Sequence, residues 1–222
     1  MPKIREELRS ADISEEHLED LSRRAAQSMA QRSLPGTLSY PTVCLILGLA
    51  TPFAADSPRL IFGVTLASLV VAIARYLLLQ NFDRVYDHSP RLWRIGVVSG
   101  LLLSGALLSG LVTRAIVDYG TGWAALLAML ITALVCTMAL LVYTHDFSVL
   151  LLFFAVLLIP PTAALLWLGT PEARWIAASG VIFVIYLVMQ GRQFHRENWR
   201  GRVNTKLLEI RAHELEEARN QA

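Results

Sequence analysis

The middle of this sequence has very little charge. Of its 222 residues only 17% are charged and 55% are hydrophobic, whereas about a quarter are charged in an average globular domain. Most charges fall in the first 37 and the last 33 residues, so 38–189 form a nearly uncharged apolar block. Polar side chains could not cover so much apolar surface in water, and we therefore expect this block to lie in a lipid bilayer.

The sequence also has only two cysteines and a small net charge, and its first residues do not have the pattern of a signal peptide. Cys44 and Cys136 both stand inside apolar runs and are interpreted as small hydrophobic residues, not as a disulfide. A net charge of only +2, without interleaved basic and aromatic residues, argues against a nucleic-acid partner. The first 35 residues have no apolar core, which argues against a cleavable signal peptide.

Six apolar stretches approach the roughly 20 residues that a helix needs to cross a bilayer. They are 38–55, 60–79, 95–117, 123–143, 147–168 and 175–189. The sequence thus predicts an all-α polytopic membrane protein with a cytoplasmic N-terminal amphipathic helix in 1–37, a six-helix transmembrane bundle in 38–190 and a cytoplasmic coiled-coil helix in 191–222. Aromatic and basic side chains are expected to anchor the spans at the interfaces: Tyr40, Trp93, Trp123, Trp167, Arg174, Arg192 and Trp199.

The basic residues predict the orientation of the bundle. They gather before the first span, after the second and after the sixth, while each opposite loop carries one arginine. By the positive-inside rule both termini are predicted to be cytoplasmic. The opposite loops are short, so any external signal would be read within the membrane or at its outer rim. The basic residues after the second and sixth spans are Arg84, Arg91, Arg94, Arg192, Arg196, Arg200 and Arg202.

The N-terminal segment carries a predicted helix. Ser14 followed by Glu15 and Glu16 has the pattern of a helix cap with acidic residues in the first turn. Pro35 and Gly36 are expected to end this helix. We expect it to rest on the membrane surface or on the cytoplasmic tail. Its apolar residues at helical spacing are Leu18, Leu21, Ala25 and Met29.

The C-terminal segment predicts one helix that continues from the sixth span, because 190–222 contain no proline and many strong helix formers. Leu208, Leu215 and Ala222 are seven residues apart, and Ala218 adds a small residue, which is typical of an imperfect coiled coil. We expect a parallel homodimer through this helix. The pattern stops at Ala222 without a capping glycine or proline, so we expect a cytoplasmic output domain to follow.

Three side chains in or beside the spans are candidate ligand-binding residues. Arg75 stands inside the second span, where a buried charge is costly and indicates function. It lies only five residues from Gln80, however, and we favour the interpretation that it extends to the cytoplasmic interface. His145 and Asp146 occupy the turn between spans four and five, where such a pair can sense pH or bind a metal. No further ligand has suitable spacing, so a solvated turn is preferred and neither a metal nor another cofactor is predicted.

Prolines and small residues mark two further spans. Pro160 and Pro161 remove two backbone donors from the fifth span and should kink or break it, which would either shape a ligand pocket or only bend the helix. Gly96, Gly100 and Ser104 recur every four residues in the third span. Such a stripe lets another helix approach closely, within the bundle or across a dimer.

No catalytic constellation is recognisable. Ser104, Ser109 and Ser179 precede glycines, as does the nucleophile of rhomboid-like proteases, but none has the second glycine of the Gly-x-Ser-Gly pattern. The spans also lack a histidine base, a pair of carboxylates and a His-Glu-x-x-His zinc motif. We therefore assign no catalytic residues to this chain.

The order of the segments resembles that of bacterial membrane sensors. An N-terminal helix and six closely spaced spans precede the charged helix Arg-Ala-His-Glu-Leu-Glu-Glu-Ala-Arg-Asn-Gln-Ala. This layout is similar to the membrane region of hybrid sensor histidine kinases, in which such a helix leads into the dimerisation and phosphoacceptor domain. It is also similar to diguanylate cyclases with multispan sensors. His213 on this helix is interpreted as a solvated residue, not as the phosphoacceptor.

The resemblance implies the sensory input module of a two-component histidine kinase in the bacterial inner membrane. Such a module would detect a small hydrophobic or amphipathic molecule, or a property of the bilayer, and transmit the signal through the sixth span to a kinase. The alternatives are the sensor of a diguanylate cyclase, a small transporter or channel subunit, and a structural membrane subunit without a ligand.

Overall fold

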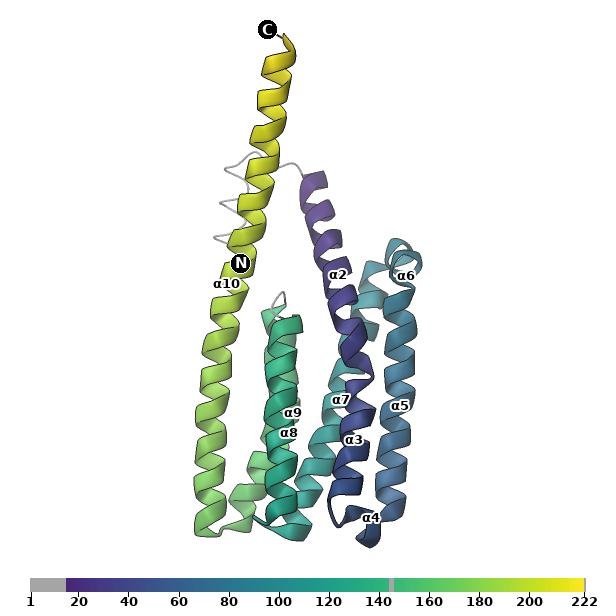
Figure 1. The fold of residues 1–222 in the computed structure, drawn as a ribbon, viewed down its shortest axis with the longest axis vertical. Coiled ribbons are helices and arrows are strands. Elements are labelled where there is room, and N and C mark those ends of the chain that lie inside the picture. Colours follow the sequence, from purple (N-terminus) through teal and green to yellow (C-terminus); the bar gives the residue numbers. More distant parts are fainter. Residues whose placement is uncertain (1–14, 144–145, 222) are drawn as a thin grey trace.

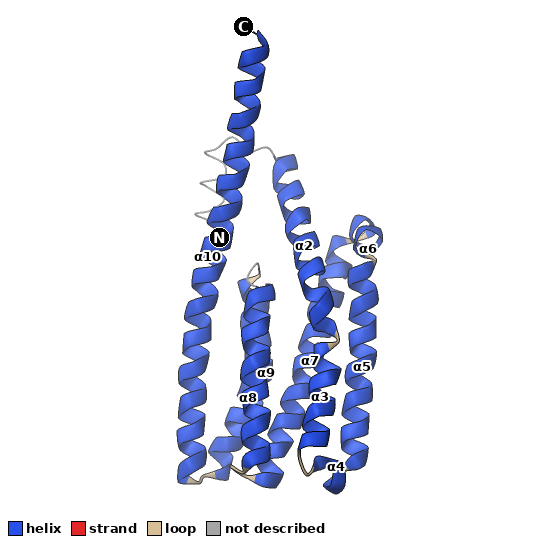
Figure 2. Cartoon of the chain, in the orientation of Figure 1, coloured by secondary structure: helices blue, strands red, loops and turns tan. Residues whose placement is uncertain are grey.

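The computed structural model describes residues 15–143 and 146–221 (Figure 1). These residues are helical apart from short turns and contain no strand (Figure 2). The described helices are α2 (Glu15–Thr37), α3 (Ser39–Ala50), α4 (Phe53–Asp56), α5 (Pro58–Gln80), α6 (Phe82–His88), α7 (Pro90–Tyr119), α8 (Trp123–Tyr143), α9 (Phe147–Leu168) and α10 (Pro171–Gln221).

Within the described residues, six helical segments are long and apolar enough to cross a membrane, which confirms the predicted fold class. The fourth and fifth have the predicted bounds. The first begins at Ala26 instead of residue 38, because α2 continues almost directly into α3. The segments are Ala26–Ala50, Pro58–Gln80, Pro90–Tyr119, Trp123–Tyr143, Phe147–Leu168 and Pro171–Glu197.

The N-terminal helix departs from the prediction. α2 runs through Pro35 and Gly36 to Thr37, and only Leu38 separates it from α3. Figure 1 shows α2 standing on the end of α3 and rising along the bundle axis, so it does not lie flat across the bundle end. The hydroxyls of Thr37 and Ser39 donate to the carbonyls of Leu34 and Gly36, at 2.8 and 2.6 Å. These bonds satisfy carbonyls beside the interruption at Leu38. The prediction that Pro35 and Gly36 end the helix is wrong.

The core is built around α7 and α9. About 44% of each of these two spans is buried inside the bundle, more than in any other span of the described chain. Leu101 and Val112 of α7 and Leu150 and Phe153 of α9 are fully buried. In contrast, α10 packs on the outside, against α9 and α8, and only 17% of its span is buried. The sixth span therefore presents most of its apolar surface outward.

One end of the bundle, here called the short-loop end, consists of tight connections between spans. Gly120 and Gly169 have positive φ angles of 61° and 73°, which favour glycine because it lacks a Cβ. The hydroxyl of Tyr119 donates to the carboxylate of Asp56 at 2.7 Å, and the Tyr119 ring packs edge-on against Phe53. These contacts close the short-loop end.

At the opposite end, here called the extension end, α10 and α2 both project beyond the other helices (Figure 1). The short helix α6 folds against this end through a ring cluster of Phe82, Tyr86 and Trp93. Arg23 of α2 pairs with Asp87 of α6 at 3.0 Å. α6 was not predicted, since seven residues give too short a pattern to recognise.

The predicted interfacial anchors divide into two groups. Trp123 and Trp167 are exposed near the short-loop end, as an anchor requires. Tyr40 and Trp93 are buried, so their assignment as anchors is wrong. Both residues were predicted to be anchors because they stand near the ends of spans. In the structure, α2 and α6 cover the positions where these rings would meet the interface. The side chain of Trp199 lies outside those that the structure describes.

The small-residue stripe of α7 faces α5. A Cβ added at Gly96 would lie 2.7 Å from a Leu78 methyl group, and one at Gly100 would lie 2.5 Å from Cγ of Arg75. Ser104 is buried and donates to the carbonyl of Gly100 at 2.8 Å. Both glycines thus allow close packing of two helices inside one bundle.

The two prolines of α9 do not break it. The helix is continuous from Phe147 to Leu168, with Pro161 buried and Pro160 exposed. Of the two predicted outcomes, a kink or a break, the structure excludes the break.

A pair of alanine substitutions on α7 tests this packing. A Cβ at Gly105 would lie 2.8 Å from the ring of Phe153, whereas one at Gly110 has no neighbour within 4 Å. We expect Gly105→Ala to lower the free energy of unfolding by about 1–3 kcal/mol through overpacking. Gly110→Ala should be neutral or slightly stabilising. Denaturant unfolding in micelles, followed by circular dichroism, measures both, and equal stability of the two variants would contradict the packing.

Candidate functional site

Arg75 on α5 is buried inside the bundle. Only 3% of the residue is exposed, and no other charged side chain in the described part is buried. Its aliphatic stem passes over Gly100, where the lack of a Cβ makes room for it. The interpretation that Arg75 extends to the interface is therefore wrong. The last turns of α2 and the first turns of α3 cover this part of α5, and the guanidinium turns inward between helices.

The guanidinium has two partners, and both are tyrosines. Its Nη2 donates to the hydroxyl of Tyr143, at the end of α8, with a distance of 2.7 Å. The central carbon lies 5.8 Å from the ring centroid of Tyr40 on α3, within cation–π range. Neither partner carries a negative charge. Burying an uncompensated cation costs several kcal/mol, so the arrangement does not favour stability.

Two of the three guanidinium nitrogens have no hydrogen-bond partner in the protein. Nε and Nη1 of Arg75 are buried and unpaired, and no Asp or Glu of the described residues forms a salt bridge with this side chain. These two nitrogens carry most of the donors of the group. The protein therefore leaves two nitrogens of this buried cation without an acceptor.

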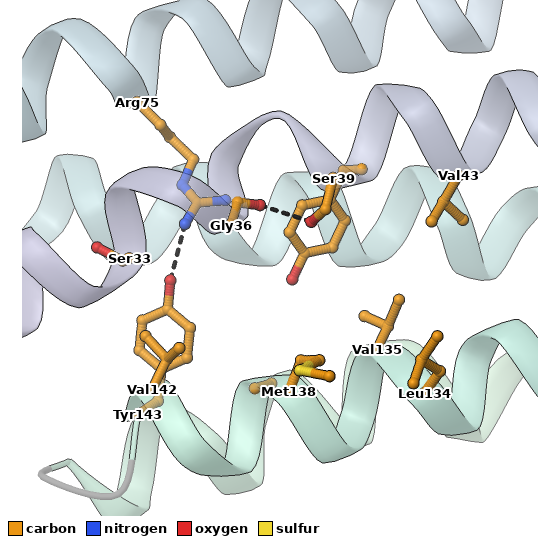
Figure 3. A pocket seen from close by; sticks show the side chains of 12 residues that line it. Ser33, Gly36, Ser39, Val43, Arg75, Leu134, Val135, Met138, Val142 and Tyr143 are labelled. Carbon is orange, nitrogen blue, oxygen red and sulfur yellow. Dashed lines mark hydrogen bonds between the residues drawn. The ribbon is translucent and has the colours of Figure 1, made fainter.

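A cavity of about 130 Å³ lies beside Arg75, between the α2–α3 segment and α8 (Figure 3). In Figure 3 the guanidinium points across it toward Tyr143, and apolar side chains of α3 and α8 line the rest. The lining residues are Ser33, Gly36, Ser39, Tyr40, Val43, Arg75, Leu134, Val135, Met138, Ala139, Val142 and Tyr143.

Most polar groups of the wall are already engaged within their own helices. The hydroxyl of Ser33 donates to the carbonyl of Ala30 at 3.1 Å, and that of Ser39 donates to Gly36 at 2.6 Å. Tyr143 uses its oxygen as an acceptor for Arg75, so its own hydroxyl hydrogen stays available. The side chains of the wall whose donors are not engaged in this way are Arg75, Tyr143 and Tyr40.

The remaining predicted ligand residues do not join this cavity. Asp146 caps α9 by accepting from the amide of Val149 at 3.4 Å, and it forms an ion pair with Arg94 at the extension end. Pro160 and Pro161 lie on α9, which contributes no residue to the wall. His145 lies outside the described residues. Nor do the described residues contain a group of three potential metal ligands.

Sequence reasoning missed Tyr143 and Tyr40. Each stands near the end of an apolar stretch, where tyrosine usually indicates an interfacial anchor. The signal that could have identified them is pairing: an intramembrane arginine needs partners, and these tyrosines lie at a similar depth on other helices. Which helices meet at that depth depends on topology, which spacing along one chain does not give.

A double-mutant cycle tests whether Gly100 and Arg75 are energetically coupled. We expect Gly100→Ala to cost about 1–3 kcal/mol of unfolding free energy, because its Cβ would overlap the arginine stem. In an Arg75→Ala background the cost should fall, with a coupling energy of about 0.5–3 kcal/mol. The same denaturant unfolding measures all variants. Additive costs would show that the two residues do not interact.

Replacing the buried charge tests whether Arg75 lowers the stability of the folded bundle. We expect Arg75→Met to be as stable as the natural protein or more stable by about 1–4 kcal/mol, because the desolvation cost disappears. Arg94→Met, which removes an exposed arginine paired with Asp146, should change stability by less than about 1 kcal/mol. A large loss for Arg75→Met alone would mean that the cation is a structural element.

Comparison with known proteins finds no matching family model, no similar curated protein and no similar solved structure. The resemblance to membrane sensors therefore rests on the order of the segments.

Proposed function

We propose that this chain is the transmembrane input module of a sensory protein, with a two-component histidine kinase as its output. The observation that carries the proposal is α10, a single helix of 51 residues from Pro171 to Gln221. At 1.5 Å per residue it is about 75 Å long, whereas the hydrocarbon core of a bilayer is about 30 Å thick. A displacement of the last span would therefore be carried outside the membrane without an intervening joint.

The position of α10 favours such movement. It packs against α9 and α8 on the outside of the bundle, and most of its span is not buried by other helices. Few internal contacts need to change when it slides or rotates. The exposed apolar side chains on this span include Val181, Ile182, Ile185 and Met189. Lipid or a second copy of the chain would cover them.

Close packing holds α10 to the bundle near the extension end. A Cβ at Gly191 would lie 3.2 Å from the ring of Phe147 and 3.3 Å from methyl groups of Leu140 and Leu150. The guanidinium of Arg192 lies 5.9 Å from the centroid of the same Phe147 ring. At this level a shift of α8 or α9 pushes directly on α10.

The cavity is connected to this contact by the turn between α8 and α9. Tyr143, the partner of Arg75, is the last residue of α8, and its carbonyl accepts from the amide of Asp146 at 3.2 Å. Phe147, which contacts α10, is the next residue. We propose that a ligand at Arg75 displaces Tyr143, and that this turn transmits the displacement to Gly191.

The proposed orientation places the extension end in the cytoplasm, because the basic residues after the second and sixth spans gather there. The proposed membrane is the bacterial inner membrane. The heptad positions Leu208, Leu215, Ala218 and Ala222 would then bring two copies together in a parallel dimer. A dimeric helix of this kind serves a diguanylate cyclase equally well, so that output is the second candidate.

Disulfide cross-linking tests the dimeric helix. In a background without Cys44 and Cys136, we expect Leu208→Cys and Leu215→Cys to cross-link two copies in native membranes upon mild oxidation. Lys206→Cys and His213→Cys provide the matched control, since they are also seven residues apart but lie about 160° around the helix from Leu208 and Leu215. They should cross-link several-fold more slowly. Equal rates for both pairs, or no cross-link in correctly inserted protein, would refute the parallel dimer.

A further inference from the structure

We propose that the cavity beside Arg75 binds the carboxylate head of a single-chain, fatty-acid-like amphiphile whose apolar chain lies between α3 and α8. The proposal that the cavity binds such a molecule rests on the geometry of the cavity alone. The proposal that this molecule is the signal of the module rests on the proposed function.

Charge is the first argument. Arg75 is 3% exposed, has no carboxylate partner among the described residues, and leaves Nε and Nη1 unpaired. In a low-dielectric interior, an anion is the ligand that offsets the cost of such a cation. Its oxygens could accept from the guanidinium and from the hydroxyl of Tyr143, which lie 2.7 Å apart. Hydrogen bonds from a charged donor to a charged acceptor are the strong kind.

The shape of the cavity supplies the second argument. Away from Arg75 and the two tyrosines the wall is mainly apolar, with Val43 on α3 and Val135 and Ala139 on α8, and the hydroxyls of Ser33 and Ser39 are already bonded to nearby carbonyls. A small inorganic anion would leave this part of the wall without a partner. A molecule that carries its charge at one end and hydrocarbon at the other matches both parts.

Size limits the ligand further. A cavity needs about 10–15 Å³ to hold one water molecule, so 130 Å³ accommodates on the order of ten such groups. A carboxylate followed by a short run of methylenes fits this space.

Access is from the bilayer. Leu134 and Met138, which line the cavity on α8, are each more than half exposed on the outside of the bundle. The outer part of the wall therefore borders the lipid. An amphiphile dissolved in the membrane can enter sideways, with its head reaching Arg75 and the end of its chain remaining among the lipid tails.

The experiment measures binding of decanoate to the full chain. The protein is placed in nanodiscs of phosphatidylcholine, and decanoate labelled with ¹³C at the carboxyl carbon is titrated and followed by NMR, with empty nanodiscs as the reference. We expect a saturable carboxyl resonance distinct from that of the bilayer pool. Decanol, which has the same chain without the charge, should not compete. Absence of a saturable resonance, or equal competition by decanol, would overturn the proposal.

Four variants assign the site. Arg75→Gln should weaken binding at least tenfold and Tyr143→Phe several-fold, because each removes donors for the carboxylate. Ala139→Leu should weaken it by filling the chain part of the cavity while leaving both donors in place. Arg94→Gln, at the exposed ion pair with Asp146, should bind as the natural protein does. If Arg75→Gln fails to fold, the other two site variants decide, and unchanged binding in both would refute the site.

A second arm distinguishes a fatty acid from a lipid head group. The titration is repeated in nanodiscs containing phosphatidylglycerol, and lipids retained by the purified protein are identified by mass spectrometry. Unchanged decanoate binding supports the carboxylate. Loss of decanoate binding, with phosphatidylglycerol retained by the natural protein but not by Arg75→Gln, would overturn the fatty-acid class in favour of a phosphate head group.

The cross-linking assay separates this inference from the proposed function. Decanoate binding without any change in Leu208→Cys cross-linking would support the site and contradict its role as the signal. A specific dimer cross-link in a protein that does not bind decanoate would support the helix dimer and contradict the site.

Discussion

The buried hydrogen bond between Arg75 and Tyr143 is the constraint around which the candidate site of this bundle is arranged. In the described part of the chain it is the one buried hydrogen bond that joins two side chains, at 2.7 Å. It links α5 to α8, two helices that are otherwise separated by α7 and by the α2–α3 segment. Because the pair has no carboxylate, it leaves a positive charge in a region of low dielectric constant, and the surrounding structure accommodates that charge without neutralising it.

Several local features follow from this constraint. Gly100 leaves space for the arginine stem, Tyr40 places a ring near the guanidinium, and α2 continues from α3 to cover the site from the extension end. A bundle selected only for stability would fill the same volume with hydrocarbon. A buried cation, an aromatic partner and a cavity occur together at one place. This combination is the physical reason to regard the region as functional.

Sequence reasoning predicts those parts of the fold that depend on local composition. The fourth and fifth spans have the predicted bounds because uniform apolar runs fill the length between turn residues. The first span was predicted to be too short, since Pro35 and Gly36 normally end a helix, whereas α2 continues through both residues to Thr37. The sequence marks Arg75 as a candidate but does not predict its contact with Tyr143, because Gln80 is near in sequence while Tyr143 is near only in the folded bundle.

The central claim is that occupation of the cavity at Arg75 moves α10. Spin labels at Leu208 in two copies, measured by pulsed electron resonance in nanodiscs with and without decanoate, test it most directly. The account predicts that decanoate shifts the distance distribution in the natural protein and that the shift is lost in Tyr143→Phe at decanoate concentrations that saturate the variant. An equal shift in both proteins, or no shift in a natural protein with decanoate bound, would contradict it.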